Sequence, residues 1–253
     1  MKRTFSIIIC SLIFLILNNG NSIAVEETED QVLIESYYED ITGDGQKDEI
    51  RLMGVPFSEE TSYFHSIWVD ISTPNDREWK ISYEGGYDPS LQFIDVNHDN
   101  INDIIYQSAT GGTGELYHYN VHTLANDKVS VIELPKPAYI SGKFQEDFKA
   151  SLTITPGKDP IIVDLKDRAD DYIRLGLYNT EGELQEQKTL MVDPIAFFDP
   201  VFINKEKGYG LKSYQQISGA YHADQLGTIE TLWYLEKDKW RNVKTEWVPS
   251  DIE

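Results

Sequence analysis

Asp40-Ile-Thr-Gly-Asp-Gly-Gln-Lys-Asp48 is a stretch whose pattern returns 55 residues later as Asp95-Val-Asn-His-Asp-Asn-Ile-Asn-Asp103. In both stretches, oxygen-bearing side chains stand at positions 1, 3, 5 and 9. Position 6 holds Gly or Asn, which tolerate a left-handed backbone. This layout lets a short loop wrap a hard cation such as Ca²⁺, which takes about six to eight oxygen ligands. Two copies in matching surroundings predict a repeated metal-binding loop.

The pattern names ten candidate calcium ligands. At position 7, Gln46 and Ile101 would offer backbone carbonyl oxygens, and the other candidates would offer side chains. The first set is Asp40, Thr42, Asp44, Gln46 and Asp48, and the second is Asp95, Asn97, Asp99, Ile101 and Asp103. Position 12 is Arg51 in the first stretch and Tyr106 in the second, so the bidentate Glu of an EF-hand is absent.

The segments beside both loops have the composition of strands. They are short runs of β-branched and aromatic residues, bounded by Gly, Asn and Asp, which is a hairpin signal. The runs are residues 32–38 and 49–53 around the first loop, and 91–94 and 104–106 around the second. The sequence therefore predicts that each ion lies in the turn of a β-hairpin.

The succession of strand, D-x-[DNT]-x-D-G-x-x-D loop and strand resembles the FG-GAP/VCBS repeat of integrin-type β-propellers and many secreted bacterial proteins. The resemblance covers about residues 30–133. It implies four-stranded blades with Ca²⁺ in a hairpin loop, usually in binding or adhesive proteins. Thr42 stands where an acid is commoner, and Asn97 and Asn100 are further departures. The smaller number of charges predicts weaker calcium binding.

Two units of four strands are expected in this part of the chain. Their predicted bounds are 31–38, 48–53, 64–72 and 77–82, and then 90–94, 103–107, 115–124 and 128–133. Repeated four-stranded units with a fixed turn are typical of propeller blades. We therefore expect an all-β fold, a β-propeller-like array of four-stranded antiparallel blades with calcium-binding hairpin loops. The alternative is two calcium blades packed on a separate β domain.

The repeated pattern fades after about residue 135. Strand-like runs continue at residues 152–155, 161–163, 172–178, 229–235 and 240–247. Residues 138–150 and 193–209 look like loops, and the acidic residues 164–171 like a solvated loop. The expected organisation is a signal peptide at 1–24, two calcium-binding repeats at 25–135, and degenerate β repeats or a C-terminal β domain at 136–253.

The first 24 residues have the features of a secretion signal. Lys2 and Arg3 precede an apolar run, and Ser22-Ile-Ala24 offers small residues for cleavage. An uncleaved N-terminal anchor is the alternative. Cys10 is the one cysteine, so the remaining 229 residues have no disulfide, as is common in exported proteins of Gram-positive bacteria. We expect a secreted, extracellular protein with no membrane span after cleavage.

The formal charge of −21 becomes −23 when Lys2 and Arg3 are removed. A field of this sign opposes nucleic acid and anionic membranes and favours cations and basic partners. No nucleic-acid partner is therefore expected. The charge also keeps an extracellular protein soluble.

Other candidate sites carry weaker signals. Residues 111–114 are Gly-rich but lack the following helix of a phosphate loop, so a hairpin turn is expected. His118 and His122 stand about 13 Å apart along one strand, too far for one ion. His222 could be catalytic, but no nucleophile motif accompanies it, and a structural role is favoured. Five tryptophans could stack against sugar rings, but aromatic residues in strands are more often part of a core. They are Trp68, Trp79, Trp233, Trp240 and Trp247.

The expected function is that of a secreted, non-catalytic calcium-binding protein of FG-GAP/VCBS type. It would serve as a binding or adhesion scaffold for a protein or polysaccharide ligand. One alternative is an extracellular hydrolase of wall or polysaccharide substrates, with calcium loops as scaffold and a site near His222. A further alternative is a sugar- or protein-binding module that uses the Trp-rich C-terminal strands.

Overall fold

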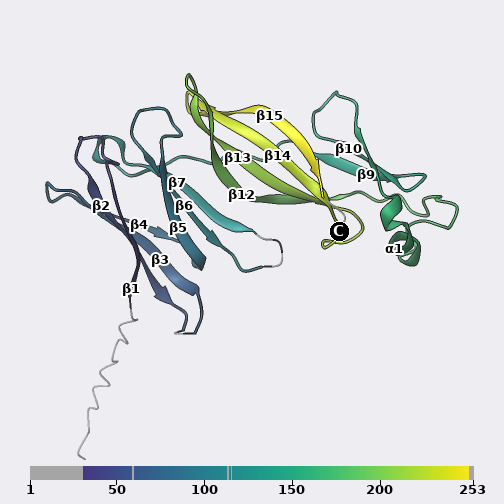
Figure 1. Ribbon diagram of the computed structural model, residues 1–253, viewed down its shortest axis with the longest axis horizontal. Helices are drawn as coiled ribbons and strands as arrows, with labels where there is room; N and C mark the ends of the chain where they lie inside the picture. The colour runs from purple at the N-terminus through teal and green to yellow at the C-terminus, as the bar shows by residue number, and fades with distance from the viewer. Residues whose placement is uncertain (1–30, 59, 113, 115, 251–253) are drawn as a thin grey trace, which may run out of the picture.

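The computed structural model describes residues 31–58, 60–112, 114 and 116–250. The all-β prediction is confirmed, because these residues form fifteen strands in three antiparallel sheets with one short α-helix. The sheets follow one another along the long axis of the molecule (Figure 1). The expected signal peptide, residues 1–24, lies outside the described residues.

The first sheet contains eight strands in two meanders. These are β1 (Val32–Glu39), β2 (Asp48–Pro56), β3 (Tyr63–Ser72), β4 (Glu78–Tyr83), β5 (Gly86–Ile94), β6 (Asp103–Ala109), β7 (Tyr117–Thr123) and β8 (Ser130–Val131). The short 3₁₀ helix η1 (Ala125–Asp127) lies between β7 and β8. β3 pairs with β4 along Ile67–Ser72 and with β5 only at Tyr63 and Phe64, so the two meanders join there.

The two meanders share one hydrophobic core. Ile50 and Val69 come from the first meander, and Ile104 and Tyr106 from the second, and all four are almost fully buried. The two four-stranded units therefore have the predicted strand content but are joined in one sheet. The sheets form a row rather than a ring around an axis, so the structure does not show the propeller-like array (Figure 1).

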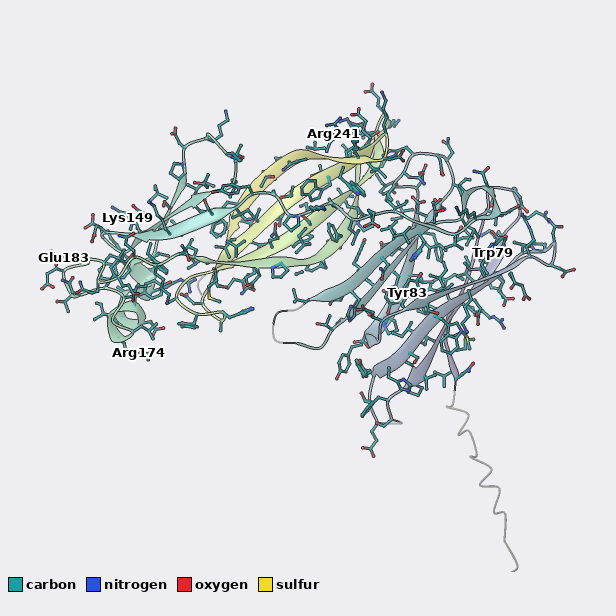
Figure 2. All side chains as sticks on the ribbon, turned by 180° about the vertical axis from the view of Figure 1, so that it is seen from behind. Trp79, Tyr83, Lys149, Arg174, Glu183 and Arg241 are labelled. Carbon is teal, nitrogen blue, oxygen red and sulfur yellow. The ribbon has the colours of Figure 1, made fainter. Side chains whose placement is uncertain are left out.

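The second sheet lies at the far end of the molecule. It contains β9 (Ser141–Gln145), β10 (Lys149–Thr153) and β11 (Ile161–Asp164), and is followed by the 3₁₀ helix η2 (Lys166–Arg168) and α1 (Ala169–Arg174). Figure 2 shows Lys149, Arg174 and Glu183 at this end, opposite Trp79 and Tyr83.

Three predictions for this part of the chain are wrong. Residues 138–150 were expected as a loop but contain β9 and the start of β10. Residues 164–171 were expected as a loop and residues 172–178 as a strand. Instead, α1 takes up the end of the first range and the start of the second. Acidic residues in the first turn and Arg174 in the last favour a helix here. Its single buried residue, Tyr172, packs edge-on against Phe144 of β9.

The third sheet is a four-stranded meander in the middle of the molecule. Its strands are β12 (Met191–Asn204), β13 (Gly208–Ser218), β14 (Gln225–Glu236) and β15 (Lys239–Pro249). The prediction of a loop at residues 193–209 is wrong, since β12 occupies most of it. β12 contains Pro194 and Pro200, which are tolerated because β12 is an edge strand with register shifts.

A separate core joins the first sheet to the third. Tyr119 and Val121 of β7, together with Val96 from the connection between β5 and β6, pack with Phe198 and Trp233 from the third sheet. The expected boundary at residues 135 and 136 falls between β8 and β9. None of the helices in the described part of the chain is long and apolar enough to cross a membrane.

Candidate metal centre

The two acidic stretches lie in hairpin turns, as predicted. Loop 1 (residues 40–48) joins β1 to β2, whose last paired residues are Glu39 and Asp48. Loop 2 (residues 95–103) joins β5 to β6, whose last pair is Ile94 and Asp103. The equivalent pairing places position 9 of each loop at the first residue of the outgoing strand.

The two loops follow the same backbone path. Position 6 has positive φ in both, 83° at Gly45 and 69° at Asn100, as the sequence indicated. Position 4 also has positive φ, 73° at Gly43 and 66° at His98. The positive φ at position 4 was not predicted from the sequence, although Gly43 adopts it without strain and His is among the non-Gly residues enriched in the left-handed region.

The position 1 carboxylates fold the loops by accepting backbone hydrogen bonds. Asp40 Oδ1 accepts from Gly43 N at 2.7 Å, and Asp40 Oδ2 accepts from Gly45 N at 2.9 Å. In loop 2, Asp95 Oδ1 accepts from His98 N at 2.6 Å, and Asp95 Oδ2 from Asn100 N at 2.9 Å. Aspartate stabilises turns in this way.

The position 9 carboxylates are fully buried. Asp48 Oδ2 accepts from Ile41 N at 3.0 Å and Thr42 N at 3.2 Å, and Asp103 Oδ2 makes the equivalent bonds to Val96 and Asn97. Burial raises the pKa of Asp103 to about 7 against the opposing effect of these N–H donors, and burial also raises the pKa of Asp48. A cation beside such a carboxylate would favour its charged form.

Two buried oxygens of loop 1, Asp48 Oδ1 and Thr42 Oγ1, have no hydrogen bond of good geometry, although the neighbouring Thr42 side chain acts to lower the pKa of Asp48. Both belong to predicted ligands. Buried polar atoms usually have partners, so an exception calls for an explanation, and a bound ion is one. In loop 2, Asn97 Nδ2 donates to Asp103 Oδ1 and to Asp99 Oδ2, each at 3.1 Å. In loop 2 the Asn97 amide therefore bridges Asp99 and Asp103, the two carboxylates that a bound ion would bridge.

Position 5 is held by hydrogen bonds in both loops. Asp44 Oδ1 accepts from Gln46 N, and Asp99 Oδ1 accepts from Ile101 N, each at 2.9 Å. Asp44 Oδ2 also accepts from Arg77 Nη2 at 3.1 Å. In the described residues, no group of three or more His, Cys, Asp or Glu side chains stands ready to hold a metal ion.

The donor set suits a hard cation even so. Each loop gathers its candidate ligands within nine residues, and all of the ligand atoms would be oxygens, which Ca²⁺ prefers. A carboxylate oxygen that accepts one N–H bond keeps a second lone pair. Coordination by Asp44 Oδ2 would require its release from Arg77.

Each loop also contacts a neighbouring part of the fold. The Arg77 guanidinium bridges Asp44 of loop 1 and Asp127 of η1. His98 of loop 2 stacks on Tyr234 of β14, with ring centroids 4.6 Å apart, and Lys207 Nζ lies 4.9 Å from the same Tyr234 ring. The loops themselves are adjacent, because the Ile101 side chain lies against Gly43.

The other residues singled out from the sequence have structural surroundings. His118 pairs with Glu84 at 2.7 Å, while His122 is buried. β6 and β7, which flank the Gly-rich stretch, pair antiparallel, as expected for a hairpin. The five tryptophans take part in packing or backbone hydrogen bonds: Trp68 and Trp233 are buried, Trp79 and Trp240 donate to backbone carbonyls, and Trp247 packs on a core.

Comparison with known proteins finds a family model that matches the C-terminal part and a protein that is similar over most of the chain. Residues 138–248 match the family model of the YybI C-terminal domain. That segment contains the whole second sheet and the third sheet up to one residue before the end of β15. The uncharacterized protein YybI of Bacillus subtilis (strain 168) is 29% identical over 208 residues, which cover 80% of this chain and 79% of YybI. No solved structure matches this chain.

The resemblance to FG-GAP/VCBS repeats is wrong. No model of that repeat matches, and the similarity found is to YybI. The physical reason lies in the motif itself. Aspartates at positions 1 and 5 accept local N–H bonds that stabilise a hairpin turn in any fold. The motif therefore indicates a turn conformation and does not identify a protein family.

Proposed function

We propose that the protein is a non-catalytic binding protein, outside the cell, whose loops 1 and 2 each bind one Ca²⁺ ion. The main support is the pair of buried oxygens in loop 1, Asp48 Oδ1 and Thr42 Oγ1, which lie near each other and have no hydrogen bond of good geometry. The shared backbone path extends the argument to loop 2. Because the position 9 carboxylates are buried, an ion beside them would offset the cost of burying their charge.

The ions would brace the two hairpins of the first sheet. Extracellular calcium sites can be weak, with dissociation constants of about 10⁻⁴ to 10⁻³ M. Binding to the folded state alone stabilises it by an amount that grows with the ratio of free calcium to dissociation constant. We therefore expect the melting temperature to rise with calcium over the millimolar range.

Calorimetric titration of calcium into chelator-treated protein tests this function. We expect two binding events in the wild type, and one each in Asp44→Ala and Asp99→Ala. Asp159→Ala, which removes an exposed acid from the β10–β11 connection, is the matched control and should retain both events. An absence of binding up to millimolar calcium, or two events in both loop variants, would contradict the proposal.

A hydrolase is a second candidate, because His222 Nε2 lies 3.3 Å from Asp193 Oδ2 beside a cavity. Such a pair can orient a histidine for proton transfer. The described residues that line the cavity include no Ser or Cys to act as nucleophile. Activity on ester or polysaccharide substrates that disappears in His222→Ala, with the fold intact, would favour this candidate over the first.

A further inference from the structure

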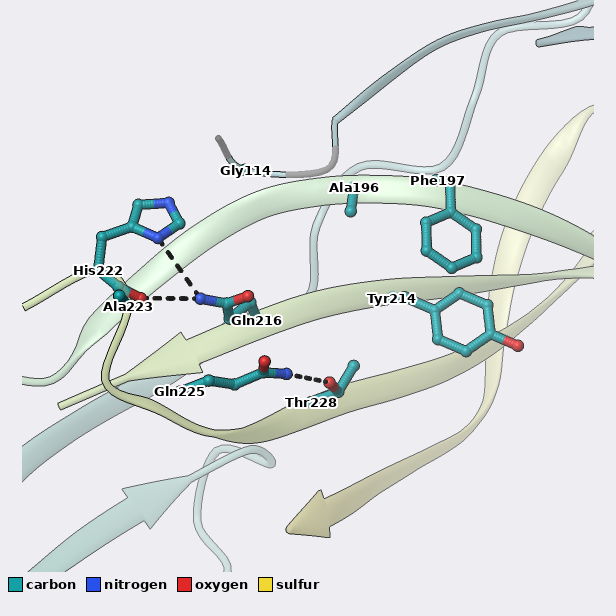
Figure 3. A pocket seen from close by; sticks show the side chains of 9 residues that line it. All are labelled: Gly114, Ala196, Phe197, Tyr214, Gln216, His222, Ala223, Gln225 and Thr228. Atoms are coloured by element: carbon teal, nitrogen blue, oxygen red, sulfur yellow. Dashed lines mark hydrogen bonds between the residues drawn. The ribbon is translucent and has the colours of Figure 1, made fainter. Parts of the chain in front are cut away.

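A cavity of about 400 Å³ opens on the third sheet, away from loops 1 and 2. Its lining side chains come from three adjacent strands and from the turn between β13 and β14 (Figure 3). They include Phe197 of β12, Tyr214 and Gln216 of β13, Thr228 of β14, and His222 of the turn. The volume lies within the range of small-molecule sites in proteins, about 300 to 1,000 Å³.

Aromatic rings form the centre of this surface. Phe197 and Tyr214 stack with centroids 4.5 Å apart and an interplanar angle of 19° (Figure 3). Tyr117 of β7 approaches Phe197 edge-on at 5.8 Å and is 39% exposed. A smaller cavity of about 150 Å³ shares Phe197 with the first and is also lined by Gln107, Tyr117 and Asp199. We call the two cavities together the β12 groove.

Polar groups stand at both ends of the β12 groove. At one end His222 pairs with Asp193, and the Gln216 amide donates to His222 O at 3.0 Å and to Ser218 Oγ at 2.9 Å. Both hydrogen bonds use the amide nitrogen of Gln216, so its carbonyl oxygen remains an acceptor. At the other end, Asp199 lies beside the Tyr214 hydroxyl; burial and this carboxylate both raise the pKa of Tyr214.

The distance between the two ends is set by β12. Asp193 and Asp199 are six residues apart on one strand, which spans up to about 20 Å when extended. The groove is therefore long enough for a chain of several sugar units. A single small metabolite would fill only one of its two cavities.

We propose that the β12 groove binds a neutral oligosaccharide. Phe197 and Tyr214 would contact the apolar faces of sugar rings, while Gln216 and Asp199 would hydrogen-bond hydroxyl groups. Aromatic rings and amides complement these two features of a sugar. The carboxylates at both ends and the overall charge of −21 oppose an anionic ligand, and Lys212, which lies 5.7 Å from the Tyr214 ring, is already paired with Glu230. A wholly apolar ligand would leave the amide and carboxylate groups unpaired.

The inference does not depend on calcium binding. None of the residues that line the groove belongs to loop 1 or loop 2. Binding measured with chelator and again with calcium therefore separates the two proposals. A groove that binds glycan in chelator supports this inference whatever the loops do.

Calorimetric titration of the purified protein with three tetrasaccharides is the test: α-1,4-linked glucose, β-1,4-linked glucose and β-1,4-linked N-acetylglucosamine. Tyr214→Ala should weaken binding at least about tenfold, as loss of a central aromatic contact does. Tyr209→Ala is the matched control, since Tyr209 lies on the same strand, 37% exposed, and packs on Phe202. Thr228→Arg, at a partly exposed position, should block the cavity with little effect on folding.

Binding of at least one tetrasaccharide that is weakened in Tyr214→Ala and Thr228→Arg, but not in Tyr209→Ala, would support the proposal. No binding by any of the three at millimolar concentration would overturn it. Equal affinity for the tetrasaccharide in the wild type and in Thr228→Arg would also overturn it. Thr228→Arg keeps this test available if Tyr214→Ala does not fold. A basic peptide that binds in place of the sugars would assign the groove to a different ligand.

Discussion

Individual backbone positions decide how the acidic loops fold. At Gly43 an added Cβ would lie 2.7 Å from Ile101 Cδ1, while at Gly45 an added Cβ would meet open space. Both residues have positive φ, so a side chain at Gly43 would meet backbone strain and a close contact, while a side chain at Gly45 would meet backbone strain alone. The side chain that restricts Gly43 comes from loop 2. A local turn signal is thus reinforced by a contact between hairpins.

His122 is expected to make the folded protein sensitive to acid. It is buried, its Nδ1 makes no hydrogen bond, and burial lowers its pKa. The unfolded chain takes up a proton near the ordinary pKa of about 6.5, and the folded chain only at lower pH. The unfolded state therefore binds more protons, and the free energy of unfolding falls as pH drops through this range.

Urea denaturation at pH 7.5 and 5.5, in chelator, measures this effect. His122→Gln should lose less stability than the wild type between these two pH values. His118→Gln, on the same strand but partly exposed, is the control. It should lose as much stability between the two pH values as the wild type does, because His122 is unchanged. An unchanged pH dependence in His122→Gln would refute the assignment.

At the scale of the elements, hairpin turns gather around the acidic loops. Arg77, in the connection between β3 and β4, pairs with Asp44 of loop 1 and Asp127 of η1. One guanidinium thereby links the turns of both meanders. It also occupies a carboxylate oxygen that we assign to calcium.

Arg77→Ala should strengthen calcium binding at loop 1 severalfold. The substitution frees Asp44 Oδ2 and removes a positive charge beside the ion, while loop 2 should keep its affinity. Loss of two partly exposed ion pairs should lower the free energy of unfolding by only about 1 kcal/mol. Calorimetric titration measures both sites, with Arg241→Ala, a surface arginine on β15, as control. A weaker loop 1 would show that Arg77 organises the site instead of competing for it.

At the scale of the whole molecule, the chain runs outward and then returns. β9 to β11 and α1 form the far end, and β12 to β15 come back to pack on the first sheet (Figure 1). The joint combines Tyr119 and Val96 with Phe198 and Trp233. This shared core makes the folding of the first and third sheets interdependent.

Phe198→Ala should weaken that joint. Phe198 is 5% exposed and packs on Tyr119 at 5.2 Å between ring centroids. Its truncation should cost about 3 to 5 kcal/mol and leave a cavity. Scanning calorimetry should then show two separate transitions in place of one. Phe202→Ala, on the same strand but 53% exposed, should change little. A single transition at the wild-type temperature in Phe198→Ala would mean that the joint does not couple the sheets.

The first sheet and the two loops were predictable because their determinants are local. Alternating apolar residues specify strands, and aspartates that accept nearby N–H bonds specify the turns. Most strand bounds before residue 135 differ by only a few residues from those expected. The ligand assignment stays a prediction, since the same aspartates stabilise the turn whether or not an ion binds.

The sequence by itself determined the all-β class, the eight strands of the first sheet and the place of both acidic loops in hairpin turns. Tertiary structure decided the rest. β12 contains prolines that suggest a loop, and it is a strand because β13 supplies its hydrogen bonds. α1 depends on burial of Tyr172. The β12 groove combines side chains from distant strands, and only packing between the sheets brings Tyr117 to Phe197.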